Sequence, residues 1–204
     1  MQATGIILAG GKSRRMGTNK ALLIVDGLTI IERIAKELGK ITTEIIIATN
    51  NFEDYQFLNL PMVEDKIKGK GPLAGIQAGL AESKNEKNLI ATCDMPFISA
   101  KLGAFLLQSL DEYEAAVPEV SGRLHPLYAA YRKETLGAVN RAIADENLKI
   151  RHFLKTVNAK IVTENDFPFT LNEKYLYNMN HPEEYEQALR IQSEMKKIEG
   201  VSGN

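Results

Sequence analysis

A cationic loop near the start of the chain, LAGGKSRRMGTNKALL, combines residue types that bind phosphate groups. Gly10 and Gly11 have no side chains, so their backbone N–H groups can approach an anion closely. Four positive charges lie within nine residues, and the stretch contains no acid to neutralise them: Lys12, Arg14, Arg15 and Lys20. We therefore predict a site for nucleotide phosphates here, with a solvated basic surface loop as the alternative.

The letters GKS in this loop do not form either of the familiar nucleotide-binding motifs. A Walker A motif has a glycine five positions before the glycine of its GK pair, and Ile6 stands at that distance from Gly11. The dinucleotide motif GxGxxG is excluded as well, because Gly10 and Gly11 are adjacent. The loop is thus predicted to hold phosphates through its two glycines and its cations, without forming either of these motifs.

Two aspartates follow apolar stretches further along the chain. Asp94 closes the stretch LIATCD, and Asp65 follows PMVE. A triphosphate is usually bound with Mg²⁺, which takes one or two carboxylates together with phosphate oxygens. Either aspartate alone is also compatible with a simple turn residue. We predict that both aspartates face the cationic loop, in a site where a carboxylate holds the metal and the cations hold the phosphates.

The elements that must position these residues alternate between strand and helix. Seven apolar runs are predicted strands: Thr4–Leu8, Glu44–Ala48, Pro61–Val63, Asn88–Thr92, Ala115–Val117, Leu127–Tyr131 and Lys160–Thr163. Helices are predicted at Thr29–Leu38, Pro72–Leu80, Ser99–Leu110, Glu134–Ala144 and Leu148–Lys155, and from Pro182 onward. Strands that are apolar throughout are typical of a sheet covered on both faces, so we predict an α/β, Rossmann-like, mostly parallel sheet with helices on both faces.

This fold class explains why the chemical residues are spread along the chain. Ligands of such sheets bind beyond the carboxyl ends of the strands. Three segments are predicted to meet there, namely Leu8–Lys20, Glu64–Gly75 and Thr92–Phe97. The candidate site is therefore expected at one edge of the sheet.

The length, the net charge and the cysteine count limit the remaining function classes. The chain has 204 residues and a net charge of −1, so one domain over residues 1–200 with a tail at 201–204 is expected, without a basic field for nucleic acid. Its single cysteine, Cys93, excludes an intrachain disulfide and fits a reducing cytosol. The N-terminus lacks the features of a secretory signal, and no run approaches the roughly 18 apolar residues of a membrane span. We expect a cytoplasmic protein that does not bind a membrane.

The loop LAGGKSRRMGTNK resembles the LAGGxSxRMGxxK signature of molybdenum cofactor guanylyltransferases, which are part of the wider glycosyltransferase-A-like nucleotidyltransferases. The likeness continues in GPLAGIQAGL, CDMPFI, HPLYAAYR and YNMNHPEEY, which come in family order and span nearly the whole chain. The resemblance implies the nucleotide-diphospho-sugar transferase (GT-A-like) fold. It also implies a nucleotide-binding half at about residues 1–98 and a pterin-substrate half at about residues 99–200.

The same resemblance implies transfer of GMP from GTP to molybdenum-bound molybdopterin, with Mg²⁺ as cofactor and with other proteins that deliver molybdopterin or receive the product. The catalytic residues that it implies are Arg15, Lys20 and Asp94, with Asp94 as the metal ligand. The implied nucleotide-binding residues are Leu8, Ala9, Gly10, Gly11, Lys20, Asn50, Asp65 and Asp94. On the pterin side it implies His125, Asn178 and Asn180.

No general base is needed for this reaction, because a phosphomonoester nucleophile with a second pKa of about 6 is already ionised near neutral pH. Two alternatives stay open at this point. One is a cytidylyltransferase or sugar-phosphate nucleotidyltransferase with the same loop. The other is a non-catalytic nucleotide-binding adaptor that keeps the fold.

Overall fold

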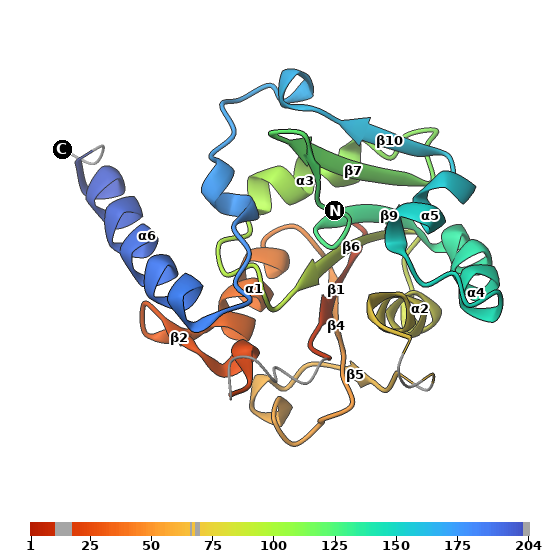
Figure 1. Cartoon of the computed structure of the whole chain (residues 1–204), viewed down its shortest axis with the longest axis horizontal. Helices are drawn as coiled ribbons and strands as arrows, with labels where there is room; N and C mark the ends of the chain where they lie inside the picture. The colour runs from red at the N-terminus through yellow and green to blue at the C-terminus, as the bar shows by residue number, and fades with distance from the viewer. Residues whose placement is uncertain (11–17, 66, 68–69, 202–204) are drawn as a thin grey trace.

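The computed structural model of the chain describes residues 1–10, 18–65, 67 and 70–201. Within these residues, eight strands form one sheet in the order β10-β7-β9-β6-β1-β4-β5, with β8 paired to β7 (Figure 1). Their bounds are β1 Thr4–Leu8, β4 Glu44–Ala48, β5 Met62–Val63, β6 Lys87–Thr92, β7 Ala115–Val120, β8 Arg123–Leu124, β9 Ala129–Arg132 and β10 Ala159–Val162.

The centre of this sheet is parallel, as the apolar strands predicted. β1 pairs in parallel with β4, from Thr4 opposite Glu44 to Leu8 opposite Ala48, and it pairs in parallel with β6 on its other side. β9 is antiparallel to both β6 and β7, so the sheet is mixed. The carboxyl ends of β1, β4, β5 and β6 consequently lie at one edge.

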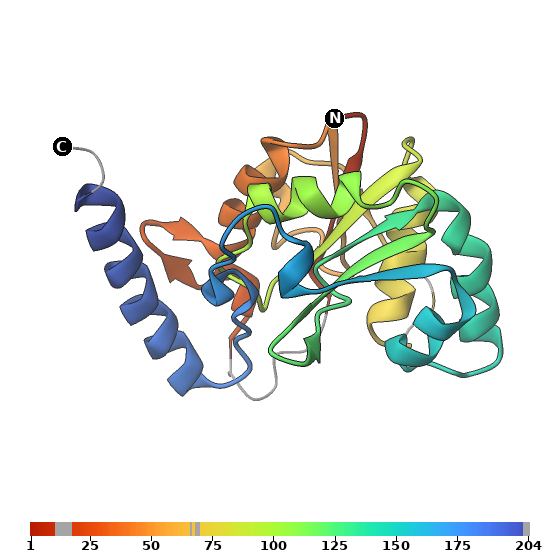
Figure 2. The same ribbon diagram turned by 90° about the horizontal axis from the view of Figure 1, so that it is seen from above.

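Helices cover both faces of the sheet (Figures 1 and 2). Buried side chains of α1 (Ile30–Gly39) and α3 (Ala100–Gln108) belong to the core on one face. Those of α2 (Pro72–Glu82), α4 (Leu136–Ala144) and α5 (Ile150–Phe153) belong to the core on the other. Successive residues of β1 alternate between these two cores, with Ile7 in the first and Ile6 in the second. Both faces of the strand are therefore buried, which explains its unbroken apolar sequence.

Local signals decide where two of the helices begin. Thr29 accepts a hydrogen bond from the Glu32 backbone, and the Glu32 side chain accepts one from the Thr29 backbone, which is a capping box at the start of α1. Ser99 caps α3 in the same way through the backbone N–H of Leu102. Thr29 and Ser99 are the first residues of the two predicted helices, and the structure places each of them at the N-cap.

Two hairpins were not predicted from the sequence. β2 (Ile24–Val25) pairs with β3 (Leu28–Thr29) through a turn at Asp26 and Gly27, and both turn residues have positive φ. A similar turn at Ser121 and Gly122 connects β7 to β8. Turns with two positive φ angles match the twist of a hairpin. The strands that were not predicted, β2, β3 and β8, are only two residues long. They therefore show too little periodicity to be recognised in the sequence.

The last helix, α6 (Pro182–Val201), lies beside the β2–β3 hairpin and away from the main sheet (Figure 1). The Tyr185 hydroxyl donates to the carbonyl of Ile24 at 2.7 Å. Gln192 donates to the Asp26 carboxylate at 3.3 Å, and Lys196 forms an ion pair with the same carboxylate. The C-terminal part of the chain is thereby connected to the segment that follows the cationic loop. None of the helices in the described ranges is long and apolar enough to cross a membrane.

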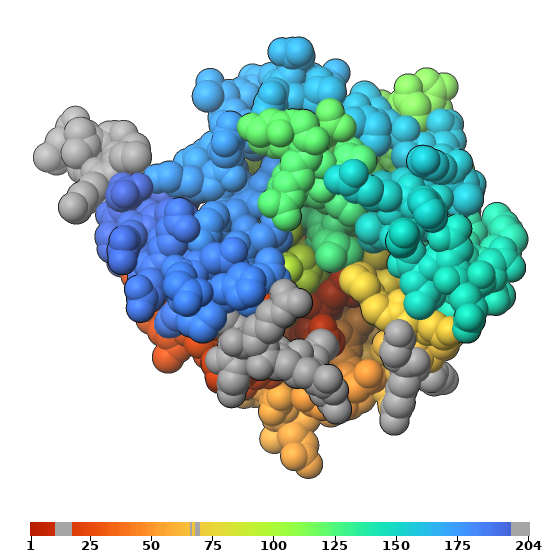
Figure 3. All heavy atoms as spheres, viewed as in Figure 1, coloured from red at the N-terminus to blue at the C-terminus, as the bar shows by residue number. Residues whose placement is uncertain are grey.

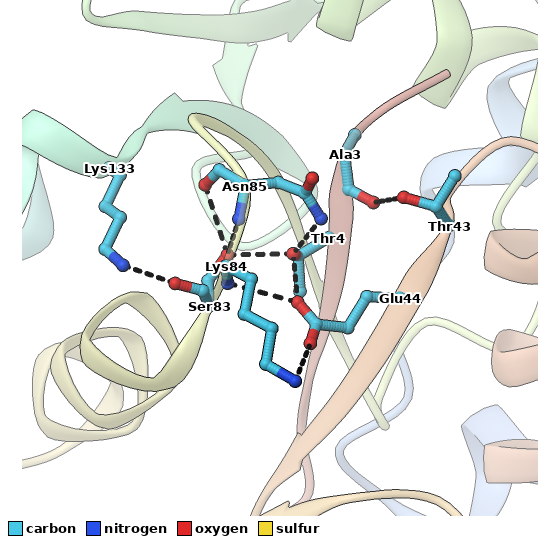
Figure 4. A network of polar contacts seen from close by, with 8 residues as sticks. All are labelled: Ala3, Thr4, Thr43, Glu44, Ser83, Lys84, Asn85 and Lys133. Atoms are coloured by element: carbon cyan, nitrogen blue, oxygen red, sulfur yellow. Dashed lines mark hydrogen bonds and ion pairs between the residues drawn. The ribbon is translucent and has the colours of Figure 1, made fainter.

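A polar network closes the amino edge of the sheet (Figure 4). The Thr4 hydroxyl donates to the Glu44 carboxylate at 2.7 Å and accepts from the Ser83 hydroxyl at 2.8 Å and from Asn85 at 3.0 Å. Glu44 also accepts from the backbone of Lys84 at 3.2 Å. Thr4 and Ser83 are fully buried, so these bonds satisfy groups that water does not reach.

Candidate active site

A pocket of about 180 Å³ opens at the carboxyl edge of the sheet. In Figure 3 this face of the molecule is hollowed over the end of β1, which is drawn in red. The pocket is formed by the ends of β1 and β6, the segment around the short 3₁₀ helix Lys20–Leu22, and the loop after β4. Its lining residues are Leu8, Ala9, Gly10, Asn19, Lys20, Ala21, Tyr55, Thr92, Cys93 and Asp94. Five predicted site residues thus meet in one place: Leu8, Ala9, Gly10, Lys20 and Asp94.

Asp94 has the most unusual environment of the pocket. Its Oδ1 atom is buried and has no hydrogen-bond partner among the described residues. Burial raises the pKa of this carboxyl group, while a hydrogen bond with Thr92 and the charges of Lys20 and Arg123 act in the opposite direction. A buried carboxylate oxygen without a partner is costly unless a cation or donor completes it. Asp94 is therefore placed to receive a cation.

The side chains at Asp94 determine which kind of magnesium site could form there. The described part of the chain contains no group of three or more His, Cys, Asp or Glu side chains that could hold a metal. An all-protein cage is thus not formed by these residues. Mg²⁺ in phosphate sites instead keeps several waters and binds one or two carboxylates plus phosphate oxygens. A single carboxylate with an unpartnered oxygen fits this second type of site.

Lys20 brings two distant parts of the chain together. Its Nζ atom donates to the backbone carbonyl of Met179 at 2.7 Å and to the side-chain oxygen of Asn180 at 3.1 Å. The backbone N–H of Met179 in turn donates to the carbonyl of Asp94 at 2.7 Å. The segment with the late asparagines therefore contacts both the predicted phosphate-binding lysine and the predicted metal ligand.

Hydrogen bonds also fix the end of β1. The N–H of Ala9 donates to the carbonyl of Ala48 at 3.0 Å, and the Thr49 hydroxyl donates to the carbonyl of Ala9 at 3.2 Å. The N–H of Ala9 is therefore already used by a hydrogen bond to β4. Gly10 follows, and no heavy atom of the described residues lies within 4 Å of the position that a Cβ atom would take there.

Asn19 and Tyr55 line the pocket and were missed in the sequence. Asn19 donates to the Tyr55 hydroxyl at 2.9 Å and to the Asp54 carboxylate at 3.0 Å, and it caps the 3₁₀ helix that carries Lys20. Burial raises the pKa of the Tyr55 hydroxyl to about 12, so this group stays protonated near pH 7. Asn19 could have been found from its place before the helix, but no local pattern marks Tyr55.

Other predicted site residues lie outside this pocket. Asn50 follows β4 at the same edge with an exposed side chain. Asp65 follows β5, and its Oδ1 atom accepts a hydrogen bond from the backbone of Ile67 at 2.9 Å, as a turn aspartate does. Asn178 donates to the carbonyl of Leu176 at 3.3 Å. Gly11 and Arg15 lie outside the described residues, so the structure does not place them.

His125 lies in the segment between β8 and β9 and is buried. Burial, together with the nearby charge of Arg123, lowers its pKa to about 4. The imidazole is therefore neutral near pH 7. Arg123 itself, from β8, is an exposed cation whose charge reaches both His125 and Asp94. The β7–β8 hairpin thus contributes positive potential to this edge of the sheet.

The chain is similar to known proteins over most of its length. The model of the MobA-like NTP transferase domain matches residues 5–161. A protein from Carboxydothermus hydrogenoformans named "Probable molybdenum cofactor guanylyltransferase" is 39% identical over 189 residues, which cover 92% of this chain and 95% of the relative. A protein of the same name from Pelotomaculum thermopropionicum is 37% identical over 195 residues, covering 95% of both chains.

Solved structures share the fold. The molybdopterin-guanine dinucleotide biosynthesis protein A from Archaeoglobus fulgidus has a TM-score of 0.80 at 24% identity, covering 94% of this chain and 99% of its own. A CMP:2-keto-3-deoxy-manno-octonic acid synthetase complexed with CTP has a TM-score of 0.74 at 14% identity, covering 97% and 99%. Both neighbours are nucleotidyltransferases of the nucleotide-diphospho-sugar transferase fold, so the predicted fold class is confirmed.

Proposed function

Because the chain belongs to the family of MobA-like nucleotidyltransferases, we propose that it transfers GMP from GTP to molybdenum-bound molybdopterin and releases pyrophosphate. Two of its relatives, at 37–39% identity over almost the whole chain, carry the name of this activity. The observation on this molecule that supports the proposal best is the pocket where Lys20 and the unpartnered oxygen of Asp94 lie together. This combination provides a cation for phosphate and a carboxylate for a metal.

The reaction is the attack of a pterin phosphate oxygen on the α-phosphorus of GTP, with pyrophosphate as the leaving group. The attacking phosphate is already ionised near neutral pH, so the protein does not have to remove a proton. Catalysis consists of positioning the reactants and neutralising charge. The protonated Tyr55 hydroxyl cannot accept a proton, and His125, whose pKa is lowered to about 4, is a weak base, so both are consistent with a site without a general base.

Magnesium is the cofactor we propose, with Asp94 as its protein ligand. When bound, Mg²⁺ supplies charge neutralisation on the phosphate oxygens. Lys20 binds phosphate and, with Arg15, stabilises the charge that develops on the pyrophosphate. The backbone at Gly10 and Gly11 supplies further donors, and no heavy atom of the described residues lies within 4 Å of the Cβ position at Gly10.

The remaining roles extend beyond the pocket. Its volume of about 180 Å³ is below the roughly 300–1,000 Å³ of typical ligand sites, so it holds only part of a nucleotide. Asn50 and Asp65 follow β4 and β5 at the same edge and are proposed to contact the rest of the nucleotide. Two residues of the C-terminal half are proposed for the pterin substrate, within the half at about residues 99–200: His125 and Asn178.

The direct test is incubation of the purified protein with GTP, Mg²⁺ and molybdenum-loaded molybdopterin. We expect pyrophosphate release in step with a guanine dinucleotide product detected by mass spectrometry. A sample without molybdopterin controls for GTP hydrolysis. Absence of both products with GTP would contradict the proposal, and turnover with CTP in place of GTP would assign the chain to the cytidylyltransferase alternative.

A further inference from the structure

We propose that Asn180 is a positioning residue for the nucleotide phosphates, because its side-chain oxygen and the Met179 carbonyl hold the Lys20 ammonium at the pocket. This inference rests on the proposed function, in which Lys20 binds phosphate. The inference places Asn180 on the nucleotide side of the reaction, whereas the family resemblance implies a role toward the pterin. The two residues are 160 positions apart in the sequence.

The segment around Met179 fixes Lys20 relative to Asp94. Met179 is fully buried, so its backbone cannot shift without disturbing the core. Its N–H donates to the Asp94 carbonyl at 2.7 Å, and its own carbonyl accepts from Lys20 at 2.7 Å. One peptide segment therefore contacts both residues to which we assign the phosphates and the metal.

Asn180 completes this bridge from a firmly held position. Its backbone N–H donates to the carboxylate of Glu184, which also accepts from the N–H of His181 at 3.0 Å. Glu184 lies in the first turn of α6. The Asn180 side chain thus extends from a fixed backbone to the Lys20 ammonium, at 3.1 Å.

The expected effect on phosphate binding follows from the charges of the groups bonded to Lys20 and from the position of Lys20 at the pocket. Neither the Met179 carbonyl nor the Asn180 amide carries a formal charge, so these two bonds orient the ammonium without neutralising it. Lys20 lines the pocket in this position, and its charge also acts on Asp94. The bonds therefore hold the cation toward the pocket, and their loss should weaken phosphate binding.

Asn178 provides a matched control in the same segment. It has the same side chain as Asn180 and lies two residues away, but its amide nitrogen donates to the carbonyl of Leu176 at 3.3 Å. The Asn180 side chain instead accepts from the Lys20 ammonium. A general disturbance of the segment should affect both variants, whereas loss of the bond to Lys20 should affect the Asn180 variant alone.

The test is calorimetric titration of the full chain with GTP and Mg²⁺, without any pterin, for the wild type, Asn180→Ala and Asn178→Ala. We expect the Kd of Asn180→Ala to rise roughly tenfold and that of Asn178→Ala to stay within about twofold. The backbone bond to Glu184 survives in both variants. If Asn180→Ala does not fold, Asn180→Ser is measured with the same expected rise.

A double-mutant cycle then separates positioning from direct contact. In the Lys20→Ala background, Asn180→Ala should change the Kd by less than about twofold, because its partner is gone. An unchanged or tighter Kd in the single Asn180→Ala variant would overturn the inference, as would an equal loss in the Lys20→Ala background. If the wild type itself does not bind GTP with Mg²⁺, the proposed function fails and the inference fails with it.

Discussion

The two edges of the parallel sheet use polar side chains in opposite ways. At the amino edge, the Thr4 hydroxyl has three partners, and Glu44 accepts from both Thr4 and the backbone of Lys84 (Figure 4). At the carboxyl edge, Asp94 keeps a buried oxygen without a partner among the described residues, beside the cation Lys20. The first arrangement stabilises the fold, and the second leaves bonding capacity for a ligand.

The amino edge also contains a buried side chain with one unbonded oxygen among the described residues, and this side chain is an uncharged amide. Asn88 is fully buried, and its Oδ1 atom is the other side-chain atom without a partner among the described residues. Its amide nitrogen, however, donates to the carbonyls of Asn85 and Glu86, each at 3.3 Å. A neutral amide costs far less to bury than a carboxylate. Of these two side chains, Asp94 at the carboxyl edge bears the larger cost, which is expected of a functional site.

The largest effect is expected for Asp94→Asn, which removes the charge without changing the shape. Loss of a metal ligand removes several kcal/mol of transition-state stabilisation, so turnover should fall about 10³-fold. The free energy of unfolding should stay equal or rise, because a buried carboxylate with one oxygen that has no partner among the described residues becomes a neutral amide. Steady-state pyrophosphate release and urea unfolding measure the two quantities.

The reverse exchange, Asn88→Asp, is the matched variant at the amino edge. It introduces a buried carboxylate that faces carbonyl oxygens, so the free energy of unfolding should fall by about 3–5 kcal/mol. Near-normal turnover of Asp94→Asn, or a stable Asn88→Asp protein, would remove the contrast between the edges.

Lys20→Ala tests the cation of the carboxyl edge. Removing one charged donor from a developing negative charge typically lowers turnover about 10²–10³-fold. The substitution also removes the hydrogen bonds to Met179 and Asn180, but these lie at a partly exposed site, so the fold should survive. Circular dichroism checks the fold, and retention of near-normal kcat would show that Lys20 has no role in charge stabilisation.

Ser83→Ala tests the amino edge. The variant loses the hydrogen bond to Thr4 and the one accepted from the backbone of Asn85. Leaving buried partners unsatisfied should lower the free energy of unfolding by about 1–3 kcal/mol, with specific activity unchanged. Urea unfolding and activity assays on the folded protein check both parts, and a loss of activity without a loss of stability would contradict the structural assignment.

A further effect is expected in the pH dependence of stability near His125. Its folded pKa is lowered to about 4, whereas the unfolded chain has the ordinary value of about 6.5. Between these values the unfolded state binds the proton and the folded state does not, so wild-type stability should fall as pH drops from about 6.5 to about 4. His125→Gln should flatten this fall, measured by urea unfolding across the window.

The control for this window is His152→Gln, because the His152 side chain is exposed. It should leave the slope of stability against pH as in the wild type. An unchanged slope in His125→Gln would show that the acid sensitivity arises elsewhere.

Several strands and helix starts could be predicted from the sequence, because they depend on the pattern of neighbouring residues. The strands Thr4–Leu8 and Glu44–Ala48 are recognisable because they are short, mostly apolar runs, and their bounds match the structure. Thr29 and Glu32 form the predicted helix start through local bonds alone. The segments after Leu8 and Thr92 meet at one edge because the strands that they follow are parallel neighbours.

The bonds within the site could not be predicted in the same way. The bond between Lys20 and Asn180 joins segments 160 residues apart, and no local pattern specifies it. Tyr55 reaches the pocket only because the loop after β4 folds back onto the end of β1. The antiparallel direction of β9 likewise depends on its partners and not on its own four residues.

A thermal-shift titration tests most directly whether the carboxyl edge binds GTP with Mg²⁺. The wild type is titrated separately with GTP, CTP, ATP and UTP in the presence of Mg²⁺, since a ligand that binds only the folded state raises Tm. We predict that GTP gives the largest rise and that the rise is lost in Asp94→Asn. A larger rise with CTP, or no rise with GTP, would contradict GTP binding at this edge of the sheet.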